Sequence, residues 1–156
     1  NANHELKLLE IGCGSGINLQ KALESGIKKE NILGTDINPL AVEHCKKLGF
    51  RCIKSDLFEN VKEKFDIIVF NPPYLPLNKN EPKYSRVATT GGKRGNELII
   101  IFLKNAKNYL KIRGRIFLIT SSLSKEVNFG KLSCKAKEIG SKKLFFEKLT
   151  LWEITL

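Results

Sequence analysis

Short apolar runs alternate with longer segments of helical character along this chain, and this alternation constrains the fold more than any other feature. The apolar runs cover residues 6–11, 31–36, 50–56, 65–70 and 113–120. Helices are expected at 17–25, at 39–48 after an Asn-Pro cap, at 96–110 with Asn96 as the cap, and at 124–139 before Gly140. Residues 142–156 predict two further strands that form a hairpin.

Nearly continuous apolar strands between helices are typical of a parallel sheet covered by helices on both faces. We therefore predict an α/β fold with a mostly parallel seven-stranded sheet and a C-terminal antiparallel hairpin. The length of 156 residues, without repeats or a linker, predicts a single domain. No apolar run approaches the roughly 20 residues that span a bilayer, so no membrane association is expected. The chain begins with Asn and contains no methionine, which predicts a fragment without its native N-terminal segment.

A glycine-rich turn follows the first apolar run. Glu-Ile-Gly-Cys-Gly-Ser-Gly places glycines at positions 12, 14 and 16, between the first strand and the first helix. Without side chains there, backbone N–H groups can approach a ligand at the start of the helix. Position 17 is Ile, so the dinucleotide fingerprint Gly-x-Gly-x-x-Gly is not matched. Taken alone, the turn fits either a ligand site or a tight structural turn.

Two aspartates are expected at the same edge of the sheet as this turn. Asp36 ends the second strand, where a carboxylate can accept hydrogen bonds from both hydroxyls of a ribose. Asp56 ends the third strand, where it can accept one from an adenine amino group. The alternatives are an Asp-Asn-Pro turn for Asp36 and a helix N-cap for Asp56. Asp66 precedes its strand at the opposite edge, and we expect it to be structural.

The fourth strand ends in Asn-Pro-Pro-Tyr at positions 71–74. Consecutive prolines stiffen a turn and provide no N–H, so their carbonyls stay available as acceptors. The Asn71 side-chain oxygen and the Pro72 carbonyl form a pair of acceptors suited to the two hydrogens of a planar NH2 group. Tyr74 can stack on the group that carries this nitrogen. The expected catalysis is positioning, with the nitrogen lone pair aimed at an electrophile. The alternative is a plain proline-rich turn.

The net charge bears on the partners of the chain, and the cysteines bear on metal binding and on the cellular location. The net charge of +11 arises from basic residues spread through every segment, which fits either a solvated surface or an anionic partner such as RNA. No Cys-x-x-Cys pair occurs, and only His4 and His44 could assist the four cysteines in a metal site. We therefore expect no metal site, and a reduced, cytoplasmic location.

The segments LLEIGCGSG, GTDINP, KSDLF and FDIIVFNPPY together resemble the class I S-adenosylmethionine-dependent methyltransferases. Asn-Pro-Pro-Tyr is the signature of the branch that methylates planar amino groups. TTGGKRGNELI and KKLFFEKLTLWEI are similar to the HemK-type glutamine methyltransferases, in particular the short archaeal and eukaryotic form. That form methylates the Gly-Gly-Gln glutamine of class I translation release factors. The resemblance implies a Rossmann-like fold, S-adenosylmethionine as methyl donor and S-adenosylhomocysteine as product.

By position, the resemblance also implies the roles of individual residues. The glutamine amide is expected at Asn71 and Pro72, followed by Pro73 and with Tyr74 beside it. The expected cofactor-binding residues are Glu10, Gly12, Cys13, Gly14, Gly16, Asp36, Ile37, Asp56, Leu57 and Asn71.

The family also implies partners, and other functions remain open. Short-form relatives commonly work with a small zinc-binding activator protein, which the edge strand expected at TLWEITL could bind by strand pairing. The family's closing segment before the first strand, which contains a Pro-x-x-Asp-Ser/Thr-like stretch, is replaced by NANHELK, which predicts weaker cofactor binding. An RNA or DNA amino-methyltransferase acting on adenine or guanine uses the same Asn-Pro-Pro-Tyr chemistry. A non-catalytic binding module would retain only the fold.

The segment 75–96 after this turn is expected to be a loop without regular structure that faces the substrate. Its basic residues are Lys79, Lys83, Arg86, Lys93 and Arg94. The alternative is a disordered, solvated excursion.

Overall fold

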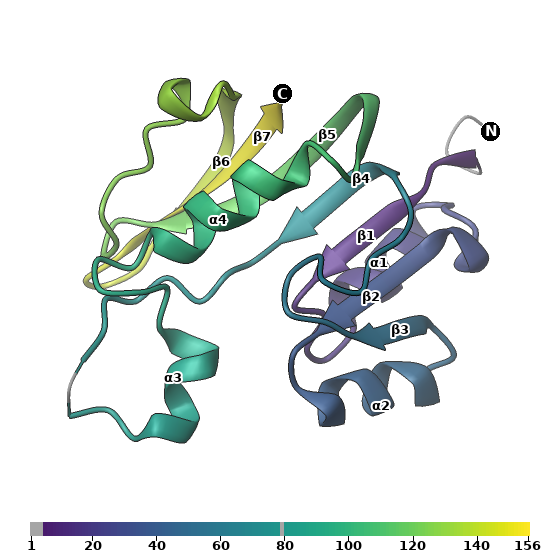
Figure 1. The fold of residues 1–156 in the computed structure, drawn as a ribbon, viewed down its shortest axis with the longest axis horizontal. Helices are drawn as coiled ribbons and strands as arrows, with labels where there is room; N and C mark the ends of the chain where they lie inside the picture. Colours follow the sequence, from purple (N-terminus) through teal and green to yellow (C-terminus); the bar gives the residue numbers. More distant parts are fainter. Residues whose placement is uncertain (1–4, 79) are drawn as a thin grey trace. The chain divides into compact units, whose positions relative to one another are not determined.

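A computed structural model describes residues 5–78 and 80–156 (Figure 1). The strands are β1 (Leu8–Ile11), β2 (Ile32–Asp36), β3 (Arg51–Lys54), β4 (Phe65–Phe70), β5 (Leu110–Ser121), β6 (Lys135–Lys143) and β7 (Lys148–Thr155). The α-helices are α1 (Ile17–Glu24), α2 (Pro39–Lys47), α3 (Lys83–Thr89) and α4 (Glu97–Ala106), with 3-10 turns η2 (Lys29–Asn31) and η3 (Gly130–Leu132).

The strands form one mixed sheet in the order β3-β2-β1-β4-β5-β7-β6. β1 pairs in parallel with β2 and β4, and β2 pairs in parallel with β3. β6 and β7 are antiparallel. The predicted α/β fold, with a seven-stranded sheet and an antiparallel C-terminal hairpin, is confirmed.

The chain divides into two compact units. The first comprises Asn1–Phe70 and Asn108–Ile116, and the second comprises Asn71–Lys107 and Phe117–Leu156. In the first unit, α1 and α2 lie beside the adjacent strands β1, β2 and β3 (Figure 1). Asparagine and proline begin α2 as predicted, because the Asn38 side chain accepts a hydrogen bond from the N–H of Leu40 at 3.0 Å.

Asp66 belongs to the architecture of the first unit. One of its carboxylate oxygens accepts a hydrogen bond from the backbone N–H of Lys7 at 2.8 Å and forms an ion pair with Lys111 at 2.7 Å. These contacts tie β4 to the segment before β1 and to the start of β5, so the structural role expected for Asp66 is confirmed.

The helix expected at 124–139 is wrong. This segment instead contains η3 and the first part of β6. Phe129 packs its ring on Trp152 of β7 at 5.1 Å between centroids, and Glu138 pairs with Trp152 across the strands. Pairing with β7 therefore overrides the local helical pattern, and Gly140 lies at a bulge inside β6 instead of ending a helix.

The C-terminal hairpin is displaced relative to the prediction. Its first strand ends at Lys143, and residues 144–147 form the turn, closed by a 2.7 Å hydrogen bond from the N–H of Leu144 to the carbonyl of Glu147. The expected edge strand TLWEITL is also wrong, because β7 lies between β5 and β6. The edge strand of the hairpin is β6, whose side chains are mostly exposed.

Segment 75–96 is not without structure, since it contains α3. Asn96 precedes α4 as predicted but does not cap it with its side chain, which donates to the carbonyl of Glu126 at 3.1 Å. Across residues 5–78 and 80–156, no helix has both the length and the apolar character to cross a membrane.

Candidate methyl-transfer site

The glycine turn of the first unit adopts a backbone that requires glycine. Gly12, Gly14 and Gly16 have φ values of 70°, 48° and 77°, in the left-handed region. The N–H of Cys13 donates to the carbonyl of Thr35 at 2.8 Å, which fastens the turn to the end of β2. The turn therefore leads into α1 without bulky side chains. A ligand that binds to backbone N–H groups needs this open approach.

Asp36 holds this turn in place. One carboxylate oxygen accepts a hydrogen bond from the N–H of Gly14 at 2.9 Å, and the other accepts one from the N–H of Asn38 at 2.8 Å. The Asp-Asn-Pro turn is thus present, and it brings Asp36 to the glycine turn. Because each carboxylate oxygen can accept two hydrogen bonds, one acceptor position per oxygen remains. Ile37 follows with its side chain partly exposed.

Glu10 is a buried carboxyl group at the end of β1. One oxygen accepts a hydrogen bond from the Asn18 side chain at 2.7 Å. Within the described part of the chain, its other oxygen is the one buried side-chain oxygen or nitrogen without a hydrogen-bond partner. Burial raises the pKa of Glu10 from 4.5 to about 7, against the lowering effect of the Asn18 hydrogen bond. An unsatisfied buried oxygen of this kind is suited to a cationic ligand group.

Asp56 does not cap a helix. A tight turn follows it instead, closed by a 3.0 Å hydrogen bond from the N–H of Glu59 to the Asp56 carbonyl. Leu57 in this turn has a φ of 46°, and Ser55 accepts from the N–H of Asn60 at 3.0 Å. The Asp56 side chain is exposed after β3. The helix-cap alternative is therefore wrong, and the role in adenine binding stays a prediction.

The Asn-Pro-Pro-Tyr turn begins the second unit. Asn71 is exposed, Pro72 is buried, and Pro73 and Tyr74 are half-buried. The exposed amide therefore stands on a turn whose next residue is packed into the protein. This burial fits a rigid base beneath a side chain that contacts a substrate.

We call residues 71–74 the acceptor turn, and the glycine-rich segment 91–95 supports its backbone. The N–H of Gly91 donates to the carbonyl of Leu75 at 3.0 Å, and the N–H of Leu75 donates to the carbonyl of Thr89 at 2.8 Å. A Cβ built on Gly91 would lie 2.6 Å from the Pro73 carbonyl oxygen, and one on Gly95 would overlap the carbonyl oxygen of Tyr74. Only glycine allows this approach of two backbones, so the two motifs form one structural element.

Glu147 interacts with Tyr74 of the acceptor turn, and this contact was not predicted from the sequence. Burial, the negative charge of Glu147 and a hydrogen bond to it raise the pKa of Tyr74. The Ser121 hydroxyl donates to the same carboxylate. Glu147 therefore adds to the effect of burial in favouring the protonated phenol, and it orients the hydroxyl. No spacing in the sequence connects positions 74 and 147, which meet only through the hairpin turn.

The basic residues of segment 75–96 are placed differently from one another. Arg86 donates to the carbonyl of Glu81 at 3.0 Å and thus helps to hold α3. Lys83, Lys93 and Arg94 are exposed, and their role in facing a substrate stays a prediction. Lys79 lies outside the described residues.

Family models match two overlapping parts of the chain. The model described as Eco57I restriction-modification methylase matches residues 47–145, and the model described as methyltransferase domain matches residues 9–72.

The curated relatives include glutamine methyltransferases. A putative protein N5-glutamine methyltransferase from Methanocaldococcus jannaschii is 42% identical over 127 residues, which cover 76% of this chain and 64% of that protein. Methyltransferase HEMK2 from Homo sapiens is 32% identical over 125 residues, covering 72% of this chain and 58% of that protein. A release factor glutamine methyltransferase from Lactococcus lactis is 31% identical and is covered to 48%. The chain therefore spans less than two thirds of the length of these relatives.

Solved structures share the fold. A ribosomal protein L11 methylase from Lactobacillus delbrueckii superposes with a TM-score of 0.65 at 18% identity, covering 94% of this chain and 69% of that one. A methyltransferase from Pyrococcus furiosus gives 0.62 at 21% identity, covering 96% of this chain and 74% of that one. Fold, family models and relatives agree: the chain belongs to the methyltransferases with a Rossmann-like class I fold, and it resembles the HemK-type glutamine methyltransferases.

Proposed function

We propose that this chain transfers a methyl group from S-adenosylmethionine to the side-chain amide nitrogen of a glutamine in a protein, the Gly-Gly-Gln glutamine of a class I translation release factor. The observation that carries the proposal is the acceptor turn at positions 71–74, with its exposed Asn71 amide and its backbone support from Gly91 and Gly95. Such a substrate would place the reaction in the cytoplasm.

The first unit offers groups that fit the cofactor. The unsatisfied oxygen of Glu10 suits an ammonium group such as that of the methionine part, and a bound cation would favour the ionised carboxylate that burial disfavours. The left-handed turn at Gly12, Gly14 and Gly16 would bind through its backbone, with Cys13 inside the turn. Asp36 would use its remaining acceptor positions for the ribose, followed by Ile37, and Asp56 with Leu57 would contact the adenine. When bound, S-adenosylmethionine supplies a methyl group on a positively charged sulfur.

The second unit would prepare the acceptor nitrogen. The Asn71 side-chain oxygen and the Pro72 carbonyl would each accept one hydrogen of the amide NH2, so that the nitrogen lone pair is less delocalised into the C=O bond and is aimed at the methyl group. As the bond from nitrogen to the methyl carbon forms, the electron pair of the breaking S–C bond would stay on sulfur and the nitrogen would release one proton to solvent. Pro73 would fix the backbone, and Tyr74, oriented by Glu147, would pack beside the amide. This chemistry depends on orientation and needs no strong base.

The test offers two acceptors in parallel. The chain is incubated with labelled S-adenosylmethionine and either a release factor or total RNA, and the label is located by peptide mapping. Label in the Gly-Gly-Gln peptide is expected. Label in nucleic acid would instead favour a nucleobase amino-methyltransferase, the alternative that the restriction-modification methylase model at residues 47–145 supports. Label in neither would favour a binding module.

The matched variant is Asn71→Ala. We expect it to abolish turnover while calorimetric binding of S-adenosylmethionine is largely retained. Methylation at the wild-type rate would refute the pair of acceptors as the basis of catalysis.

A small zinc-binding activator is also proposed as a partner. Its strand would add to β6, which is the edge strand at the C-terminal end of the sheet order and carries mostly exposed side chains. The absence of a complex in a pull-down with purified activator would refute this partnership.

A further inference from the structure

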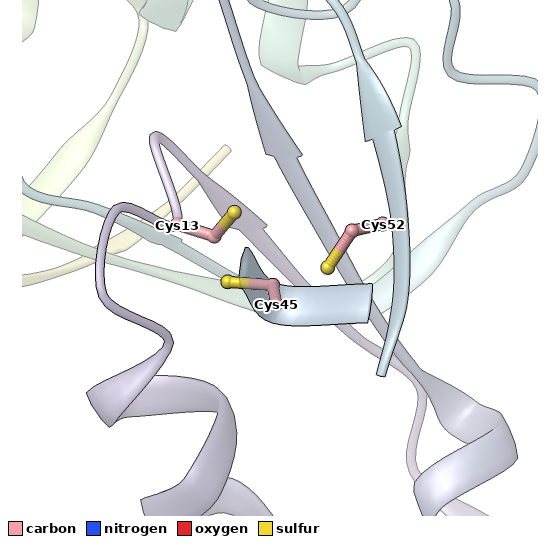
Figure 2. A group of neighbouring side chains, drawn as sticks. All are labelled: Cys13, Cys45 and Cys52. Carbon is pink, nitrogen blue, oxygen red and sulfur yellow. The ribbon is translucent and has the colours of Figure 1, made fainter. Parts of the chain in front are cut away.

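Three of the four cysteines converge beneath the glycine turn of the first unit. Cys13 lies in the turn itself, Cys45 on α2 and Cys52 on β3, and their sulfur atoms all lie within 4.8 Å of one another (Figure 2). All three are buried and none is in a disulfide. They are 32 and 7 residues apart along the chain, so no sequence spacing indicated a cluster.

The backbone makes room for this cluster. A Cβ on Gly34 of β2 would lie 2.9 Å from the Cys52 sulfur and 3.1 Å from the Cβ of Cys13. A Cβ on Gly16 would lie 3.1 Å from the Cys45 sulfur. Glycines at these two positions therefore let the three thiols come together in a site closed to solvent.

We propose that Cys13, Cys45 and Cys52 form a three-coordinate binding site for a soft, monovalent metal ion, Cu(I). Thiolates select soft ions such as Cu(I) over hard cations. A trigonal site with metal–sulfur bonds of about 2.3 Å places its sulfurs about 4.0 Å apart, so the thiols need to contract by less than about 1 Å. Neither a histidine nor a carboxylate joins the group within residues 5–78 and 80–156, which disfavours four-coordinate Zn²⁺. His4 lies outside the described residues.

Binding exchanges protons for metal. Each Cu–S bond replaces an S–H bond, the proton passes to solvent, and no electron is transferred because copper enters as Cu(I). The Cys45 thiol donates weakly to the Gly14 carbonyl at 3.5 Å, so the metal site adjoins the turn proposed to bind the cofactor.

The test is an anaerobic titration of the purified chain with Cu(I) against a chromophoric Cu(I) chelator. We expect one Cu(I) per chain, an ultraviolet thiolate-to-copper band, a raised Tm, and three sulfurs in the X-ray absorption spectrum. Cys52→Ala and Cys45→Ala should each weaken the affinity by more than the roughly 100-fold that changes outside the ligand shell cause. Circular dichroism establishes that each variant is folded.

Cys134→Ala is the matched control, because Cys134 is also buried and unbridged but belongs to the second unit. It should bind Cu(I) like the wild type. The proposal is overturned if the wild type does not compete with the chelator, if folded Cys52→Ala and Cys45→Ala bind unchanged, or if Zn²⁺ binds more tightly than Cu(I). Either of the first two results would mean that the three thiols are ordinary small core residues.

Discussion

Replacing Gly91 with alanine is expected to impair the acceptor turn while leaving the glycine turn of the first unit intact. The added Cβ would overlap the carbonyl oxygen of Gly95 and lie 2.6 Å from that of Pro73. Both obstacles are backbone atoms, so no flexible side chain can move aside. The backbone of the acceptor turn or of segment 91–95 must therefore shift.

The size of the effect follows from this overlap. Forcing one extra carbon into a packed site costs about 1–3 kcal/mol of unfolding free energy. A displacement of about 1 Å in a positioning group costs about 100-fold in rate. We therefore expect Gly91→Ala to lose about 100-fold in kcat at an unchanged affinity for S-adenosylmethionine.

The assay combines single-turnover transfer of labelled methyl to a release factor, calorimetry with S-adenosylmethionine, and urea denaturation. Gly140→Ala is the control, since a Cβ at this position of β6 meets no heavy atom within 4 Å. It should behave like the wild type in all three measurements. Wild-type kcat and stability in Gly91→Ala would refute the reasoning that the glycine-rich segment supports the acceptor turn.

Three further predictions concern carboxyl groups. Burial raises the pKa of Glu10 from 4.5 to about 7, so between pH 4.5 and 7 the folded state binds more protons than the unfolded chain. The free energy of unfolding therefore falls as the pH rises, by about 3 kcal/mol in total. Glu10→Gln should abolish this fall in urea denaturation without cofactor, and an unchanged pH profile would contradict the buried carboxyl. Glu147→Gln should shift the pKa of Tyr74 back toward its usual value, measured by ultraviolet tyrosinate titration; an unshifted value would exclude the contact. Asp66→Asn should lose its ion pair with Lys111 and about 1 kcal/mol of stability in urea denaturation, with kcat unchanged; a reduced kcat would contradict its structural role.

Local patterns predicted the first unit and the acceptor motif well. The apolar run at 65–70 became β4 with the same bounds, because a continuous apolar strand ended by prolines has few other structures available. The glycines at 12, 14 and 16 were recognisable because their left-handed backbone is a local requirement.

Between residues 124 and 139 the predicted secondary structure was wrong, because long-range contacts determine the structure there. The segment 124–139 had helical character by itself, yet its last part begins β6 because β7 offers a partner strand and Trp152 packs on Phe129. The same pairing removed β7 from the edge of the sheet. Propensity is a weak determinant wherever a neighbouring strand supplies hydrogen bonds and packing.

The sequence by itself was enough to predict the kind of chemistry, since the Asn-Pro-Pro-Tyr turn, the glycine turn and the strand-end aspartates are each short motifs with local geometry. Only the tertiary structure decided which distant residues assist them. Glu147 reaches Tyr74 through a hairpin turn, and Gly91 fits against Pro73 because two loops pack backbone to backbone. The three buried thiols meet because β1, β2 and β3 are neighbours in the sheet and α2 connects β2 to β3. Such contacts depend on how the strands are ordered in space, which no spacing along the chain records.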